Sequence, residues 1–175
     1  MITSLTQNYF ELFALPVAYA IDQNTLRERY RELQKSVHPD RYAGSTEQSR
    51  RLAAQLAAQV NQAFQTLKDP ILRGFYLLSL HGVVAEGENQ TINDTEFLIK
   101  QMAYRERLEA CAGHPATGSL LTALAEEIEV EMRHLVSAVS DAMQNYSAER
   151  AQQAQSWLRK MQFFAKLQAE IEERL

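Results

Sequence analysis

The sequence predicts an all-α protein, and three observations support this class. Apolar residues recur at spacings of three and four through most of the 175-residue chain, as on the inner face of helices. Only six Gly and four Pro interrupt it, which is too few for a turn-rich β fold. Apolar residues make up 46% and charged residues 23%, which are ordinary values for a globular protein. We expect a helical domain over residues 1–81, a linker over 82–92 and a three-helix bundle over 93–175.

The first elements are a short helix and a longer amphipathic one. Residues 8–14 are rich in apolar side chains and should form a short turn or helix that ends before Leu15-Pro16, because proline disfavours helix in the residue before it. Asp22 is a suitable N-cap for the next helix, which we expect to end at Val37. Its inner face is Leu26, Tyr30, Leu33 and Val37.

A connector over residues 38–44 separates this helix from a long one. The run Ser45–Gln48 has the form of a capping box, which predicts a helix start. The inner face of the long helix is Leu52, Leu56, Val60, Ala63 and Leu67. Asp69-Pro70 begins a further helix, with Pro in its first turn and Gly82 as its C-terminal cap. The two longer helices should form an antiparallel hairpin with the connector at its tip.

Residues 93–175 predict three long helices. Asn93 to Glu96 fits a capping pair, and the first of these helices should run to about Cys111. Residues 112–119 separate it from the second helix, and Ser147 is the expected N-cap of the third. The inner faces of the second and third are Leu121, Leu124, Ile128, Leu135 and Val139, then Trp157, Met161, Phe164, Ile171 and Leu175. Short connections between long amphipathic helices predict an antiparallel bundle.

Charge and cysteine content exclude several classes of function. Residues 1–81 carry nine Lys/Arg against seven Asp/Glu, and residues 82–175 carry nine against fifteen. Nucleic acid is therefore not expected as a partner, because phosphate binding needs a clear positive surplus. The single cysteine, Cys111, excludes an internal disulfide and any all-cysteine metal site. We see neither a leader nor an apolar run near 20 residues, so we expect a cytoplasmic protein with no membrane partner.

The tip of the hairpin carries the tripeptide His38-Pro39-Asp40. Pro39 fixes its own φ and restricts the residue before it, so the tip presents an imidazole and a carboxylate at little entropic cost. Three interpretations are open: an ordinary loop, a metal or catalytic site, and a protein-docking tip. The other histidines are His81, His114 and His134, and they lack metal-ligand spacing, so we expect neither a metal nor a cofactor.

A row of cations favours the docking interpretation. Arg27, Arg31 and Lys35 recur every four residues, so they share one helix face that leads to the tip. Such a row alone is usually only a solvated surface, and Glu28 and Glu32 dilute it. The row together with a rigid tip indicates protein docking more specifically than either feature alone.

Four stretches carry a resemblance to a known family. They are "YFELFALP", "LRERYRELQKSVHPDR", "VNQAFQTLKDP" and "YLLSLHG". In this order they resemble a J-domain co-chaperone, and with the acidic helical region that follows they are similar to the specialised bacterial type of iron–sulfur cluster assembly. The resemblance implies that residues 1–81 are a J-domain, which binds an Hsp70-type chaperone and stimulates its ATP hydrolysis.

The resemblance also implies roles for residues. His38, Pro39 and Asp40 would be the stimulating motif, and the cation row of Arg27, Arg31 and Lys35 would meet an acidic surface on the Hsp70. Arg41 stands where many J-domains have Lys, which keeps the charge but changes its geometry. The chain has no Gly-rich phosphate loop, so hydrolysis belongs to the partner and we do not expect an enzyme.

The helix over residues 94–111 has more apolar surface than one core contact needs. At about 100° per residue, one arc is Phe97, Tyr104, Leu108 and Cys111, and a roughly opposite arc is Leu98, Ile99, Met102 and Ala103, with Glu106 among them. A three-helix bundle buries about one arc per helix. The second arc should therefore face solvent or a partner, unless it packs on the N-terminal domain or a loop.

The resemblance assigns this second arc to the iron–sulfur scaffold protein. Five residues match the family's scaffold-binding positions: Leu98, Ile99, Met102, Glu106 and Phe163, the last of which lies outside the core arc of its own helix. Ala103 and Ala110 stand where the resemblance implies acidic residues, so a smaller electrostatic share of scaffold binding is expected.

We therefore expect a co-chaperone that delivers the scaffold protein to a dedicated Hsp70 and assists the maturation of iron–sulfur proteins. One alternative is a general J-domain co-chaperone that holds unfolded clients, although the chain lacks the Gly/Phe-rich and cysteine-rich segments of such proteins. A hydrolase that uses His38 and Asp40 is a second alternative, and nucleic-acid binding through the cation row is a third, which the acidic pI of about 5.6 disfavours.

Overall fold

The computed structural model describes residues 7–38, 42, 44, 46–83, 94–112 and 116–175. Every regular element within these ranges is a helix, which confirms the all-α class. The chain forms two compact units, Met1–Leu80 and His81–Leu175. None of the helices in the described ranges is long and apolar enough to cross a membrane.

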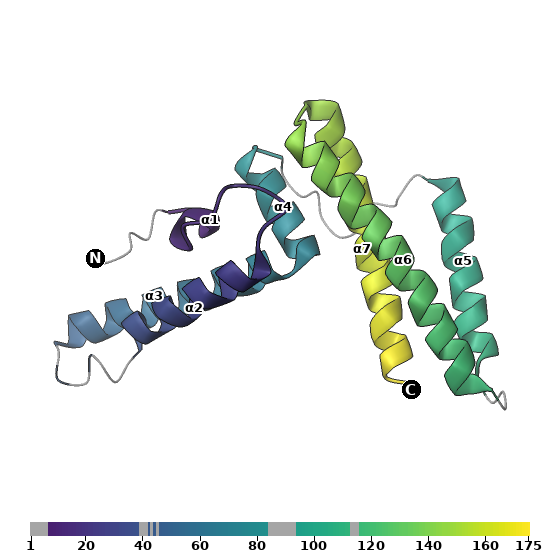
Figure 1. Ribbon diagram of the computed structural model, residues 1–175, viewed down its shortest axis with the longest axis horizontal. Coiled ribbons are helices and arrows are strands. Elements are labelled where there is room, and N and C mark those ends of the chain that lie inside the picture. Colours follow the sequence, from purple (N-terminus) through teal and green to yellow (C-terminus); the bar gives the residue numbers. More distant parts are fainter. Residues whose placement is uncertain (1–6, 39–41, 43, 45, 84–93, 113–115) are drawn as a thin grey trace. The chain divides into compact units, whose positions relative to one another are not determined.

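Unit 1 is built around the expected hairpin. Its helices are α1 (Tyr9–Leu12), α2 (Gln23–Val37), α3 (Glu47–Lys68) and α4 (Pro70–Leu80). The ribbon shows α2 and α3 side by side (Figure 1). The buried apolar side chains of the four helices and the residues after α1 include Phe10, Phe13, Leu26, Val60, Leu67 and Leu78.

Local capping explains where these helices begin. The Asp22 side chain accepts a hydrogen bond from the Asn24 N–H at 2.9 Å, as the sequence predicts. The N-cap of α3 is Thr46, which accepts from the Ser49 N–H at 3.2 Å; the expected capping box was therefore placed one residue early. Gly82 has φ of +79°, which suits a glycine just past a helix end.

Contacts made by Tyr30 and Arg73 hold α2 and α4 to α3. The Tyr30 ring of α2 stacks on Phe64 with centroids 3.9 Å apart, and its hydroxyl donates to Oδ1 of Asn61 at 3.0 Å. On α4, the buried Arg73 donates to the Leu67 carbonyl at 2.6 Å and lies 5.0 Å from the centroid of the Tyr19 ring. Burial raises the pKa of Tyr19 to about 12, against the opposing charge of Arg73. These contacts therefore fix the positions of α2 and α4 relative to α3.

Unit 2 contains the three long helices α5 (Thr95–Ala110), α6 (Thr117–Gln144) and α7 (Ala148–Glu172). In the ribbon, α6 and α7 form a long antiparallel hairpin and α5 lies alongside it (Figure 1). A shared core joins all three: Phe97, Tyr104, Leu108, Cys111, Leu121, Leu124, Ile128, Phe164, Leu167 and Ile171. The expected bundle is confirmed.

Three details of unit 2 differ from expectation. The N-cap of α5 is Asp94, whose side chain accepts from the Phe97 N–H at 2.9 Å, so the Asn93 pairing was wrong by one residue. Leu175 is 66% exposed because α7 ends at Glu172, before the next inward position. Trp157 is only half-buried, since it lines a cavity instead of filling the core.

Candidate functional site: two docking surfaces

The first surface is the basic face of α2. Arg27, Arg31 and Lys35 are all exposed, one helical turn apart, as the spacing predicts. Nη1 of Arg27 donates to Oδ1 of Asn24 at 3.1 Å, which steadies the first of these side chains. Arg31 and Lys35 line a shallow hollow at the end of the helix, together with Gln34 and His38.

His38 is the C-cap of α2 and is exposed at the end of this row. Its backbone is extended, with φ of −60° and ψ of 132°, which is the conformation that a following proline imposes. Pro39, Asp40 and Arg41 lie outside the described residues. The structure thus brings four of the seven expected Hsp70-binding residues to one side of α2 and its end.

The end of α2 is supported from behind. Gln34 donates to the Tyr30 hydroxyl at 2.5 Å and to Oδ1 of Asn61 on α3 at 3.2 Å. The hydroxyl of Tyr42, in the connector, donates to the Ser36 carbonyl at 3.3 Å. These polar contacts cannot be predicted from the sequence, because they depend on how α2 and α3 are aligned.

The second surface lies on α5, where the two expected apolar arcs are found. Phe97 and Tyr104 are buried, whereas Leu98 is 39%, Ile99 64% and Met102 64% exposed. Ala103 and Glu106 are exposed as well. The outer arc is therefore exposed and takes no part in the core of unit 2.

Phe163 of α7 differs from the side chains on α5 because it is half-buried. Its ring meets Phe97 edge-on at 5.7 Å and Phe164 at 5.4 Å between centroids. The guanidinium carbon of Arg105, whose Nη1 pairs with Glu170 at 2.6 Å, is 6.0 Å from the Phe163 centroid. Phe163 is therefore at the seam between α5 and α7, partly within the core that supports the outer arc.

Four ion pairs tie α5 to its neighbours. Lys100 and Arg107 pair with Glu131 and Glu127 of α6, and Asp94 and Arg105 pair with Lys160 and Glu170 of α7. Their order along the chain shows that α5 is antiparallel to α6 and parallel to α7. The sequence predicts none of these partners, although the seven-residue spacing of Lys100 and Arg107 places both beside the core arc.

Two of these pairs shift the titration of their members. Arg107 donates twice to Glu127, at 2.6 and 2.7 Å, and this contact lowers the pKa of Glu127 and raises that of Arg107. The hydrogen bond from Lys160 lowers the pKa of Asp94. These carboxylates are therefore charged at neutral pH, and α5 is held by charge on both sides.

The described residues contain no group of three or more His, Cys, Asp or Glu side chains that could hold a metal ion. Cys111 is buried, and its thiol donates to the Arg107 carbonyl at 3.2 Å. It behaves as a core side chain, as the sequence predicts.

Known proteins resemble this chain over nearly its whole length. Residues 93–172 match a family model described as the HSCB C-terminal oligomerisation domain. A co-chaperone protein HscB homolog of Shewanella woodyi is 42% identical over 165 residues, which cover 94% of this chain and 95% of the relative. A homolog from Shewanella baltica (strain OS195) is 43% identical over 164 residues, covering 94% of each chain.

Solved structures give the same result. The chaperone HscB from Vibrio cholerae is 38% identical with a TM-score of 0.86, covering 96% of this chain and 97% of that one. The human co-chaperone protein HscB is 27% identical with a TM-score of 0.89, covering 99% of this chain and 85% of that one.

Proposed function

Because the chain belongs to the HscB family of co-chaperones, we propose that it couples an Hsp70-type chaperone to one folded client, the iron–sulfur scaffold protein. Co-chaperones of this family assist an HscA-type Hsp70 in iron–sulfur cluster assembly, and they are not enzymes. The proposal adds the scaffold as partner, the residues that meet each partner, the division of labour between the two parts of the chain, and a cytoplasmic location.

In this proposal residues 1–81 dock on the Hsp70. His38, Pro39 and Asp40 form the stimulating motif, and the acidic surface of the partner meets Arg27, Arg31, Lys35 and Arg41. The exposed cation row that ends at His38 supports this assignment. Opposite charges raise the rate of encounter and fix orientation more than they add affinity, which suits a regulator that must leave after each ATPase cycle.

Residues 93–175 bind the scaffold in this proposal, through Leu98, Ile99, Met102, Glu106 and Phe163. The observation that carries the assignment is the exposure of three large apolar side chains on adjacent turns of α5. Such an arc costs solubility unless a partner covers it, and Met adapts its shape to a contact surface. Residues 82–92 then act as a linker, so that the scaffold bound to one domain is at high local concentration for the Hsp70 bound to the other.

A reconstituted ATPase assay tests the proposal. Purified Hsp70 is mixed with this chain, with the scaffold, or with both, and single-turnover ATP hydrolysis is followed. Tethering predicts that the pair together stimulates more than the product of the separate effects. Equal competition by a denatured polypeptide would favour a general J-domain co-chaperone instead, and a merely multiplicative effect would contradict the coupling role.

A further inference from the structure

The N-terminal half of α5 is weakly anchored in the core. Residues 95–102 carry all three large exposed apolar side chains of the helix but bury only Phe97. The C-terminal half is held by Tyr104, Leu108 and the C-cap residue Cys111. Because helix ends held by few buried contacts open locally, packing alone leaves the surface-bearing half of α5 the less stable one.

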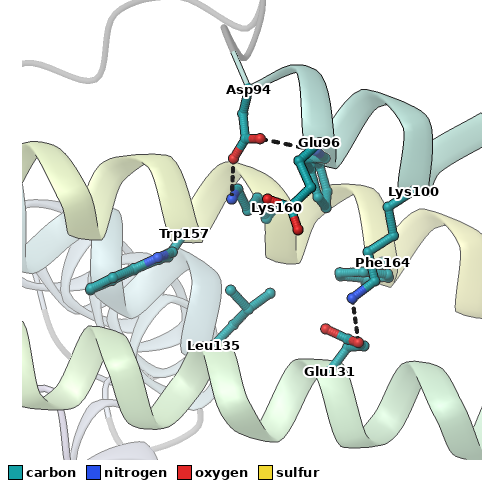
Figure 2. A pocket seen from close by; sticks show the side chains of 9 residues that line it. Asp94, Glu96, Lys100, Glu131, Leu135, Trp157, Lys160 and Phe164 are labelled. Atoms are coloured by element: carbon teal, nitrogen blue, oxygen red, sulfur yellow. Dashed lines mark hydrogen bonds and ion pairs between the residues drawn. The ribbon is translucent and has the colours of Figure 1, made fainter.

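Beside this half of α5 lies a pocket of about 210 Å³ that is open to solvent. Its apolar walls are Phe97, Leu135, Trp157 and Phe164, contributed by all three helices. Figure 2 shows Trp157 and Leu135 separated from the α5 side chains by this space. Where α5 borders this solvent-open pocket, its side chains have fewer protein contacts than they would have in a filled core.

Two ion pairs span this region, one to each neighbouring helix. Nζ of Lys160 on α7 is 2.6 Å from Oδ2 of Asp94, and Lys100 pairs with Glu131 on α6 (Figure 2). The Lys160 ammonium also lies 5.1 Å from the centroid of the Phe97 ring. The Lys160 side chain is only 19% exposed, less than that of either member of the Arg107–Glu127 pair, so solvent screens its charge less.

Asp94 has two roles in this arrangement. Oδ1 accepts the hydrogen bond from the Phe97 N–H at 2.9 Å that starts α5, and Oδ2 accepts from Lys160. The same carboxylate therefore joins the start of α5 to α7, four residues before Leu98.

We propose that the Asp94–Lys160 and Lys100–Glu131 pairs, together called the α5 clamp, hold the N-terminal half of α5 in the conformation that presents Leu98, Ile99 and Met102. The four clamp residues are positioning residues, which act through α5 and need not touch a partner. The inference rests on the proposed function for the identity of that partner, the scaffold protein. Holding a docking surface in its bound form reduces the cost of binding.

Hydrogen exchange of the full chain tests the clamp without any partner. Lys160→Met and Lys100→Met each remove one pair and keep an unbranched apolar stem. Each should raise exchange at the amides of residues 97–102 about 5-fold, and the double variant about 25-fold, if a partly buried pair contributes near the upper end for such contacts. Amides of α6 and α7 should be unchanged.

Two control variants remove ion pairs of other kinds. Arg133→Met breaks a pair within α6, Arg133–Glu129, that does not involve α5. Arg107→Met breaks the pair at the other end of α5. Neither should change exchange at residues 97–102. Equal exchange in the clamp variants and these controls would overturn the inference.

The Asp94→Asn variant removes the ion pair with Lys160 but keeps the N-cap hydrogen bond of α5. Asparagine caps helices as well as aspartate does, so this variant keeps the acceptor for the Phe97 N–H and loses the charge. It should reproduce the exchange of Lys160→Met. Wild-type exchange in Asp94→Asn would show that the ion pair does not stabilise the N-terminal half of α5, and would overturn the inference as well.

Titration with the purified scaffold protein separates the clamp from the proposed function. The loss of affinity in each variant should equal the reciprocal of the fraction of α5 that exchange shows to be closed. A loss in that proportion supports both proposals. If exchange shows α5 mostly open in the double variant and affinity is unchanged, the clamp stands and the scaffold-binding assignment of α5 fails.

Discussion

The two units use charge in opposite ways. In unit 1 the cations Arg27, Arg31 and Lys35 are themselves the exposed surface, and apolar packing between α2 and α3 holds them in place. In unit 2 the exposed surface on α5 is apolar, and ion pairs on both sides of the helix hold it in place. Where the charges lie therefore determines which unit should respond to salt, to acid and to the removal of a single side chain.

The largest effect that distinguishes the two units is expected from His38→Gln. This residue is exposed at the C-cap position of α2, outside the core, so its replacement should leave folding and scaffold binding unchanged. We expect stimulation of the Hsp70 ATPase to fall at least about 10-fold, because in the proposed function His38 acts on the Hsp70 and not within this chain. Single-turnover hydrolysis measures the first effect and scaffold titration the second. An unaltered stimulated rate would refute the assignment of the tip.

The reciprocal variant is Leu98→Ala with Phe163→Ala. It should weaken scaffold binding about 10- to 100-fold, since each large apolar side chain buried by a partner is worth roughly 1.5–3 kcal/mol and Phe163 is already half-buried. Stimulation of the Hsp70 measured without scaffold should not change.

Leu120→Ala is the matched control for that variant, because Leu120 on α6 is 41% exposed and Leu98 is 39% exposed. It should leave scaffold affinity unchanged. If the double variant loses as much stability as a core truncation, about 3–5 kcal/mol, then its two side chains serve the core more than the surface.

Salt concentration should affect binding of the two partners to different extents, although by a smaller factor than the substitutions above. Between about 50 and 200 mM salt, association of the Hsp70 with unit 1 should slow several-fold, because the cation row is exposed and the Debye length becomes shorter. Scaffold affinity should change less than about 2-fold, because apolar contact dominates and the clamp is partly shielded. Stopped-flow association rates for both partners measure this difference, and equal slopes would contradict the division of roles.

The sequence predicted the helices of both units and most of their inner faces. The apolar period and the capping residues of a helix are properties of the local sequence. Asp22 and Ser147 are accordingly N-caps where the sequence predicts them. Errors occurred where two adjacent residues could both cap, as at Thr46 and Asp94, because cap choice depends on the geometry of the preceding segment. Leu175 fits the apolar period but lies beyond the end of α7, where period no longer implies burial.

The two surfaces differ in how far the sequence predicted them. The surface of unit 1 follows from one helix and one tripeptide, so spacing alone places Arg27, Arg31 and Lys35 on one face. On α5 the exposed arc was also predicted from spacing, and the exposure of Ile99 and Met102 confirms that part. The clamp was missed, since its partners on α6 and α7 are more than 30 residues away and pair only in one alignment of three helices.

The smallest effect expected concerns acid. The hydrogen bond from Lys160 holds the pKa of Asp94 below its ordinary 3.8, and that from Arg107 holds the pKa of Glu127 below 4.5. A carboxyl whose pKa is lowered by folding stabilises the fold above its unfolded pKa, and this stabilisation is lost as the pH falls through the folded value. No loosening of α5 is therefore expected between pH 7 and pH 5 from these groups.

Below about pH 4 the two carboxylates take up protons, and α5 should loosen before the α6–α7 hairpin does. The methyl resonance of Met102 reports on the exposed arc of α5, and that of Met161 reports on the core. In Lys160→Met the Asp94 part of the transition should move to higher pH, because the largest cause of the lowered pKa of Asp94 is gone and only the backbone hydrogen bonds remain. A Met102 resonance that changes together with that of Met161 in both proteins would show that α5 has no separate electrostatic attachment, and the contrast between the two units would then rest on unit 1 alone.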